Sequence, residues 1–326
     1  MGVITTAATP PATSNAAAWA SIAVLLLGVL LAEWAAPMPI EARSLNTLAI
    51  ACAALGSAAW FYRHIRSREN FAVMCTALMQ VLIFSALGSI LSYLLARDGG
   101  PLWDSTFAAW DRALGLDWLG FVRAIDEHGW LVTTLRLAYA SLIAQIIVLV
   151  LVLGFTSRLE KLRAVMLGAI LCGTISVLAS PFFPAASNYV HLGLTAADFR
   201  FVDPWAGYIH LADFNGLRGG SMAQLDLSKM QGIITFPSYH AGLSAVTLWG
   251  FWTSGVRWLK WTGSFVALAT IVATPVDGGH YFVDVLAGVG IAVASIHVAA
   301  RAVRWTPAWP RLTAWPFRRS HAASGQ

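Results

Sequence analysis

The stretch 277-DGGHYFVDVLAG-288 sets a histidine and an aspartate four residues apart where a long apolar segment begins. In a helix, this spacing puts His280 and Asp284 on one face, so the carboxylate can accept a hydrogen bond from one imidazole nitrogen. That bond fixes the tautomer and leaves a lone pair on the other nitrogen, as a nucleophile or general base requires. Gly278 and Gly279 allow backbone or substrate to come close. The alternative is a pair that only caps the helix, and the short pattern alone does not decide.

A second stretch, 236-FPSYHAG-242, opens another apolar segment. Pro237 favours a turn or a first helical position and Ser238 is a good N-cap, so a helix is predicted to begin here. The backbone N–H groups of Ser238, Tyr239 and His240 would then point at one spot, where a helix N-terminus favours an anion. His240 at that spot can donate a proton to a leaving oxygen. The alternative is an ordinary cap with a histidine at the membrane interface.

Both stretches belong to a chain with many membrane-length apolar segments. Its 326 residues are 58% apolar and 11% charged, against about 25% charged in ordinary soluble domains. A span needs about 20 apolar residues. Eight segments, of which the sixth is short, predict an all-α fold, a polytopic membrane helix bundle. The predicted spans are 17–36, 45–62, 71–96, 131–155, 164–183, 240–253, 259–276 and 281–303.

The basic residues gather on one side of this predicted bundle. Most of the 21 lysines and arginines lie in 63–69 (RHIRSRE), 157–163 (SRLEKLR), 255–260 (GVRWLK) and 301–319. Such a bias marks the cytoplasmic side, so both termini are predicted to be cytoplasmic. The basic charge then reflects orientation and not a nucleic-acid partner. On this topology both histidine stretches reach the outer face, and ionisable groups at membrane depth indicate function.

The spans divide the chain into four predicted segments. Residues 1–16 are expected to be disordered, and 306–326 form a basic cytoplasmic tail. Residues 17–130 hold the first three spans and a helix on the outer interface over 97–130. Residues 131–305 form the catalytic core. The connection 184–237, rich in Gly, Asp, Asn and aromatics, is long enough to act as a lid.

Together the two stretches resemble motifs of the type 2 phosphatidic acid phosphatases, also called lipid phosphate phosphatases. The family's second motif, Ser-Gly-His after a proline, is matched by PSYH at 237–240. The end of its third motif, His-x-x-x-Asp, is matched by His280 and Asp284. The resemblance covers roughly the second half of the chain, from the fourth span onward. It implies a six-helix catalytic core that needs no cofactor and no metal.

The resemblance also implies roles for individual residues. His280 would attack phosphorus, Asp284 would orient it, and His240 would protonate the leaving oxygen. Ser238 and Tyr239, at the start of the second-motif helix, would hold the phosphate oxygens together with nearby cations. His240, His280 and Asp284 could instead supply three zinc ligands, but the carboxylate is better used on His280, so no metal is predicted.

The lysine and arginine residues of the family's motifs are missing from the corresponding positions of this chain. The Ser-Arg that precedes the third-motif histidine is Ala273-Thr274 here, and the first motif, a lysine followed by Arg-Pro, has no counterpart. The tyrosine of PSYH and the stretch 180–189 (SPFFPAASNY) are more similar to the inositolphosphorylceramide synthase branch, which moves a phosphorylated headgroup between lipids. Arginine's fork suits phosphate. The candidate replacements are Arg136, Arg218 and Lys229, and the alternative for each is a surface or snorkelling cation.

These observations predict an integral membrane enzyme that transfers a phosphoryl group from lipid phosphates or phospholipid headgroups through a phosphohistidine. If water is the acceptor the protein is a phosphatase, and if a hydroxyl of a lipid or sugar is the acceptor it is a phosphotransferase. The sequence leaves both open, and it predicts no oligomeric state. A transporter and a catalytically inactive scaffold with the same fold are the alternatives. His191 and His210 are assigned to the membrane interface, and the three cysteines to core packing.

Overall fold

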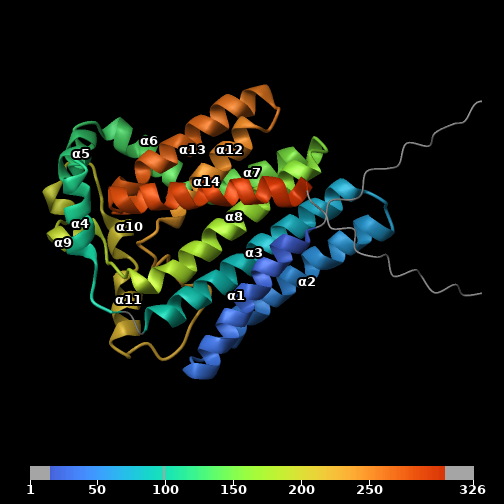
Figure 1. Cartoon of the computed structure of the whole chain (residues 1–326), viewed down its shortest axis with the longest axis horizontal. Coiled ribbons are helices and arrows are strands. Elements are labelled where there is room, and N and C mark those ends of the chain that lie inside the picture. The colour runs from blue at the N-terminus through green and yellow to red at the C-terminus, as the bar shows by residue number, and fades with distance from the viewer. Residues whose placement is uncertain (1–14, 98–99, 305–326) are drawn as a thin grey trace, which may run out of the picture.

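The computed structural model describes residues 15–97 and 100–304 and consists of helices joined by turns and loops (Figure 1). Within this range the β pairing is limited to a bridge between Ile40 and Leu225. Six helices are long and apolar enough to cross a membrane, so the predicted all-α membrane bundle is confirmed. They are α1 (Ala16–Ala35), α2 (Ala42–His64), α3 (Glu69–Ala96), α8 (Leu159–Ala179), α13 (Arg257–Asp277) and α14 (Phe282–Arg304). The predicted tail 306–326 and residues 1–14 lie outside the described range.

The other two predicted spans are helical but differ from straight membrane helices. The fourth is broken into α6 (Gly129–Ala140) and α7 (Leu142–Phe155), which meet at 56°. Side chains form hydrogen bonds with the polar groups at the break: Thr270 donates to the Ala138 carbonyl at 2.9 Å, and Gln145 donates to the Ser141 hydroxyl at 3.0 Å. The sixth is α12 (Tyr239–Trp252), whose 14 residues reach only about 21 Å at about 1.5 Å per residue. It is shorter than a bilayer core of about 30 Å.

The order of the helices in space differs from their order in the chain (Figure 1). α1 and α2 lie along α3, α3 contacts α8, and α8 packs against both α12 and α14. α12 also packs along α13. One apolar cluster joins α1, α3 and α8 through Leu25, Leu91 and Leu167. A second joins α7, α8 and α12 through buried residues such as Leu149 and Val246. The helices of both histidine stretches are therefore coupled to the N-terminal helices through α8.

Residues 97–130 were expected to form one interfacial helix, and they form two short ones, α4 (Asp104–Ala113) and α5 (Trp118–Asp126). Their acids point inward because they accept hydrogen bonds from backbone elsewhere. The Asp104 carboxylate accepts the N–H of Ala186 at 3.1 Å. The Asp111 carboxylate accepts two of the first backbone N–H groups of α14, each at 2.9 Å. Since these N–H groups have no partner inside the helix, Asp111 caps α14 and fixes where it begins.

The long connection 184–237 is held against the bundle. Tyr93 on α3 donates its hydroxyl hydrogen to Asp213 at 2.6 Å and accepts the N–H of Gln231 at 2.7 Å. Leu225 exchanges backbone hydrogen bonds of 2.8 Å with residues 39–41, between α1 and α2. The connection is thus held to α3 and to the link between α1 and α2. With α4 and α5 it lies at one end of the bundle (Figure 1). Its helices are α9 (Asn188–Leu192), α10 (Trp205–Tyr208) and α11 (Leu211–Arg218).

Asp126, at the end of α5, binds the connection 184–237 through three hydrogen bonds. Its two carboxylate oxygens accept the backbone N–H groups of Arg200, Phe201 and Val202, each at 2.7 Å. Burial raises the pKa of Asp126, but the three N–H donors and the charge of Arg200 lower it more, so the pKa lies below its usual range. The ionised carboxylate therefore holds the middle of the connection 184–237.

We predict that Asp126→Ala lowers the free energy of unfolding by about 1–3 kcal/mol, because it leaves one buried and two partly buried N–H groups without their acceptor. Thermal unfolding in detergent measures this, with the neighbouring exposed Glu127→Gln as control. The stabilisation by Asp126 should be complete above its unfolded-state pKa of about 3.9 and disappear as the pH falls through the lower folded-state pKa. Equal losses in both variants at neutral pH would contradict the assignment.

Candidate active site

The turn 278–281 between α13 and α14 is fixed by groups that bind the last carbonyls of α13. The Trp118 indole donates to the Pro275 carbonyl at 3.2 Å, and the Tyr189 hydroxyl donates to the Val276 carbonyl at 2.6 Å. These carbonyls have no partner within the helix. Gly279 then turns the chain with φ +65°, a left-handed conformation that glycine adopts without penalty. The turn therefore sets the position of His280 at the entrance of α14.

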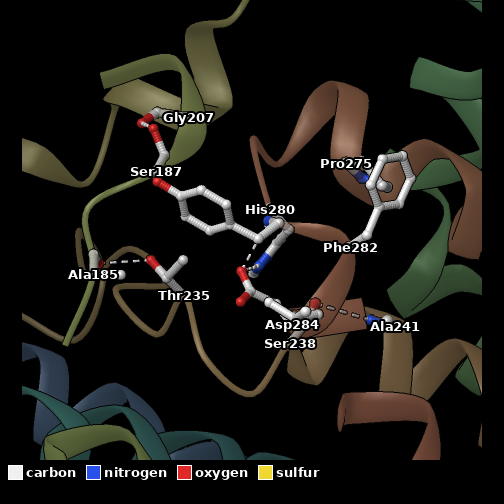
Figure 2. A network of polar contacts seen from close by, with 12 residues as sticks. Ala185, Ser187, Gly207, Thr235, Ser238, Ala241, Pro275, His280, Phe282 and Asp284 are labelled. Atoms are coloured by element: carbon white, nitrogen blue, oxygen red, sulfur yellow. Dashed lines mark hydrogen bonds and ion pairs between the residues drawn. The ribbon is translucent and has the colours of Figure 1, made fainter. Parts of the chain in front are cut away.

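His280 and Asp284 form the buried pair that their spacing predicted. His280 Nδ1 lies 3.4 Å from Asp284 Oδ2, and Figure 2 shows the carboxylate directed at the imidazole ring. The same oxygen accepts the backbone N–H of Tyr281 at 2.9 Å. Asp284 is fully buried and His280 is 5% exposed. Asp284 thus contacts the backbone of the turn as well as the ring, so its geometry fits helix capping and the orientation of His280 alike.

The state of the His280 ring follows from its surroundings. Burial lowers the pKa of His280 to about 4, and a backbone hydrogen bond with Thr235 opposes the shift only in part. The ring is therefore neutral near pH 7. With its proton on Nδ1 toward Asp284, the Nε2 atom carries the lone pair.

Ser238 caps α12 and also joins it to α14. Its hydroxyl accepts the N–H of Ala241 at 3.3 Å, as predicted for an N-cap, and its own N–H donates to the Asp284 carbonyl at 3.1 Å (Figure 2). Ser238 is fully buried, and Gly288 packs so closely that a Cβ there would collide with the Ser238 carbonyl. The N–H and hydroxyl of Ser238 are therefore both used within the protein, although the sequence assigned this residue to phosphate.

His240, on the first turn of α12, lies beside His280. The ring centroids of the two histidines are 6.4 Å apart. On its other side His240 stacks on Tyr139 of α6, with centroids 4.7 Å apart and ring planes 14° from parallel. Tyr139 carries no local sequence signal that predicted this position. It fixes the plane of His240 and so orients its nitrogens relative to His280.

A cavity of about 190 Å³ contains both histidines. Its walls come from α3, α8, α12 and the connection 184–237, and include Tyr139, Tyr239 and Gln231. His210, which the sequence assigned to the interface, also lines it; it is 5% exposed, and its Nε2 lies 3.0 Å from the Ala186 carbonyl. His210 was missed because its neighbours in sequence carry no motif. The cavity therefore holds three imidazoles.

The three predicted cations occupy different places. Arg136 pairs with Asp277 at 3.7 Å, and the Arg136 side chain is 48% exposed. Asp277 lies three residues before His280. Arg218 donates to the Gly100 carbonyl at 2.7 Å, and Lys229 pairs with Asp226 at 3.0 Å. Neither belongs to the lining of the histidine cavity, and no other lysine or arginine in the described part of the chain lines it. In the same part no three His, Cys, Asp or Glu side chains are arranged to hold a metal ion.

A buried His–Asp pair beside a second histidine, in a cavity of a helical membrane bundle, is an arrangement suited to phosphoryl transfer. The chain belongs to the PAP2 superfamily, whose sequence profile matches residues 105–298. The match runs from α4 to α14 and contains both histidine stretches. It supports phosphatase or phosphotransfer activity without distinguishing the two. Comparisons with curated proteins and with solved structures gave no match.

We predict that Gly288→Ala destabilises the protein by about 1–3 kcal/mol and separates the two histidines, because the new methyl group collides with backbone at the start of α12. Gly290→Ala, two residues further along α14, meets open space and should leave stability unchanged or slightly raised. Thermal unfolding in detergent compares the two variants. If Gly288→Ala were no more damaging than Gly290→Ala, the close approach at Gly288 would not control stability.

Proposed function

We propose that the protein is an integral membrane enzyme that transfers phosphoryl groups from lipid phosphates or phospholipid headgroups through a phosphohistidine on His280. The observation that carries the proposal is the buried His280–Asp284 pair facing the cavity that also contains His240. Membership of the PAP2 superfamily supports the same chemistry. We place this site at the outer face of the membrane and both termini in the cytoplasm, on the basis of the basic clusters.

In the first step, the Nε2 lone pair of His280 attacks phosphorus and the bond from phosphorus to the leaving oxygen breaks. The imidazole becomes cationic, and the Asp284 carboxylate stabilises that charge through Nδ1–H. Protonated His240, a form that the bound phosphate anion favours, gives its proton to the leaving oxygen and becomes neutral. The centroid separation of 6.4 Å lets one phosphoryl group contact both rings.

In the second step, an acceptor hydroxyl attacks phosphorus and the phosphorus–nitrogen bond breaks. The electron pair returns to His280, and the now neutral His240 takes the acceptor proton. With water as acceptor the product is inorganic phosphate or a phosphomonoester, and with a lipid or sugar hydroxyl it is a new ester. The transfer to a hydroxyl is the activity of the inositolphosphorylceramide synthase branch, to which the PSYH motif is similar.

The negative charge of the substrate needs donors other than the missing family arginines. Among the three predicted cations, Arg136 is the one we retain, because its partner Asp277 ends α13 directly before the turn that carries His280. Arg136 does not line the cavity, so its part in phosphate binding would require its release from Asp277. His210, Gln231 and Tyr239 also line the cavity, but their side-chain donors are directed at backbone carbonyls, so they would have to leave these partners to bind phosphate.

The catalytic prediction uses His280→Ala and Asp284→Asn in detergent. We expect His280→Ala to abolish turnover, because no nucleophile remains, and Asp284→Asn to lower kcat by about 100-fold or more, because the ring loses its charge partner. The assay is release of inorganic phosphate from lipid phosphates and polyprenyl diphosphates. Headgroup exchange between lipids is measured in parallel and separates transferase from hydrolase.

The exposed His191→Ala serves as the matched control and should behave as wild type. Thermal unfolding of each variant separates lost chemistry from lost structure. Phosphate release or exchange that persists in folded His280→Ala would refute the nucleophile, and absence of both activities in the wild type would refute the enzyme.

The pH dependence is a separate prediction. Because burial lowers the pKa of His280 to about 4, the nucleophile is neutral throughout the physiological range. We therefore expect the limb of kcat/KM that reports loss of the His280 proton to lie near pH 4, with no step from this group near its ordinary value of about 6.5. Unfolding measured over the same pH range is the control. An acid limb centred near 6.5 in folded protein would show that the ring is solvated in the free enzyme.

A further inference from the structure

Three cavities meet along α3. One is the histidine cavity, and another is a groove of about 610 Å³ between α2, α3 and residues 226–229. The third is an apolar cavity of about 310 Å³ beneath the start of α12, with walls from α2, α3, α7, α8 and α12. Ser85 lines all three. The apolar cavity is lined by residues such as Leu55, Leu82, Ile143, Ile147, Ile170 and Leu243.

Two aromatic rings separate the apolar cavity from the histidine cavity. Phe84 and Tyr239 line both, with ring centroids 6.0 Å apart and planes at 61°. They rest on Gly173 of α8, where a Cβ would collide with Phe84 and come within 2.9 Å of Tyr239. The rings therefore form a thin floor under the histidines, beside Ser85. The two cavities thus adjoin at Phe84, Ser85 and Tyr239, the residues that line both.

The apolar cavity also faces the region that lipid chains occupy. Leu82, Ile143 and Ile147 are 36%, 60% and 41% exposed, and they lie within segments that the sequence assigns to membrane spans. Leu55 lies near the middle of α2, far from either end of that helix. An apolar cavity of this size is suited to an apolar ligand, and water is a poor occupant of it.

We propose that the apolar cavity binds the hydrocarbon chain of the substrate while its phosphate lies between His240 and His280. The enzyme therefore selects long-chain lipid phosphates over short, soluble phosphate esters. This inference rests on the proposed function and names its substrate class. It also gives α2 and α3, which precede the matched residues 105–298, a part in specificity.

The first experiment narrows the cavity with Ile147→Trp and compares two probes, hexadecyl phosphate and butyl phosphate. We expect the ratio of kcat/KM for the long ester over the short ester to fall by about tenfold or more, because the indole takes the place of the chain. Leu151→Trp is the matched control: Leu151 lies one turn further along α7, is 38% exposed and does not line the cavity. A ratio unchanged in Ile147→Trp, or lowered equally in both variants, would overturn the proposal.

The second experiment needs no turnover. Hexadecyl phosphate with a diazirine in mid-chain is photo-crosslinked to the wild-type protein, and the labelled residues are mapped by mass spectrometry. We expect label around Leu82 and Ile147 that unlabelled hexadecyl phosphate displaces and hexadecanol does not. Label confined to other lipid-facing surfaces would overturn the proposal. Cavity labelling without His280-dependent turnover of either ester would refute the proposed function and leave the chain-binding site standing.

Discussion

The candidate site depends on one backbone hydrogen bond, from the N–H of Ser238 to the carbonyl of Asp284. It joins the cap of α12 to the first turn of α14, and the missing side chain at Gly288 lets the two helices approach closely enough to form it. The carboxylate of the same aspartate contacts His280. Asp284 therefore positions one histidine with its side chain and the helix of the other histidine with its backbone. Since apolar helices in lipid gain little from burial against each other, such close contacts carry much of the specificity of packing.

At the end of the bundle that holds α4, α5 and the connection 184–237, buried carboxylates take the place of regular structure as partners of the backbone. Asp104, Asp111 and Asp126 each place a carboxylate against backbone N–H groups that would otherwise lack partners. Asp111 and Asp284 together occupy the entrance of α14, so that helix terminus is not left open for an anion. The N–H of Ser238 is used as well. Of the three N–H groups at the start of α12 that the sequence assigned to an anion, the one of Ser238 is thus already bonded to Asp284, and the anion-binding role of this helix start stays a prediction.

The parts of this structure that were predictable are those set by local periodicity. Apolar length gave the long helices, and the spacing of four residues gave the His280–Asp284 pair. The bend at Ser141 was not predictable. Thr270, which binds the Ala138 carbonyl, is distant in sequence, and Gln145, which binds the Ser141 hydroxyl, belongs to no motif. Arg218 and Lys229 lie in a connection whose path is set by long-range ties such as Tyr93 to Gln231. His210 and Tyr139 reach the histidines by tertiary packing alone, so no spacing rule identifies them.

A cavity with three imidazoles and no lysine or arginine among its described lining residues has a consequence for charge. Burial lowers the pKa of both His210 and His280, so these rings are neutral when no anion is near. A bound phosphate would raise their pKa, because a nearby anion favours protonated imidazole. The substrate would then bring with it the proton that the leaving oxygen needs. Under the proposed function, a hydrocarbon chain in the apolar cavity would anchor the anion in place of the arginines that the described lining of the histidine cavity lacks.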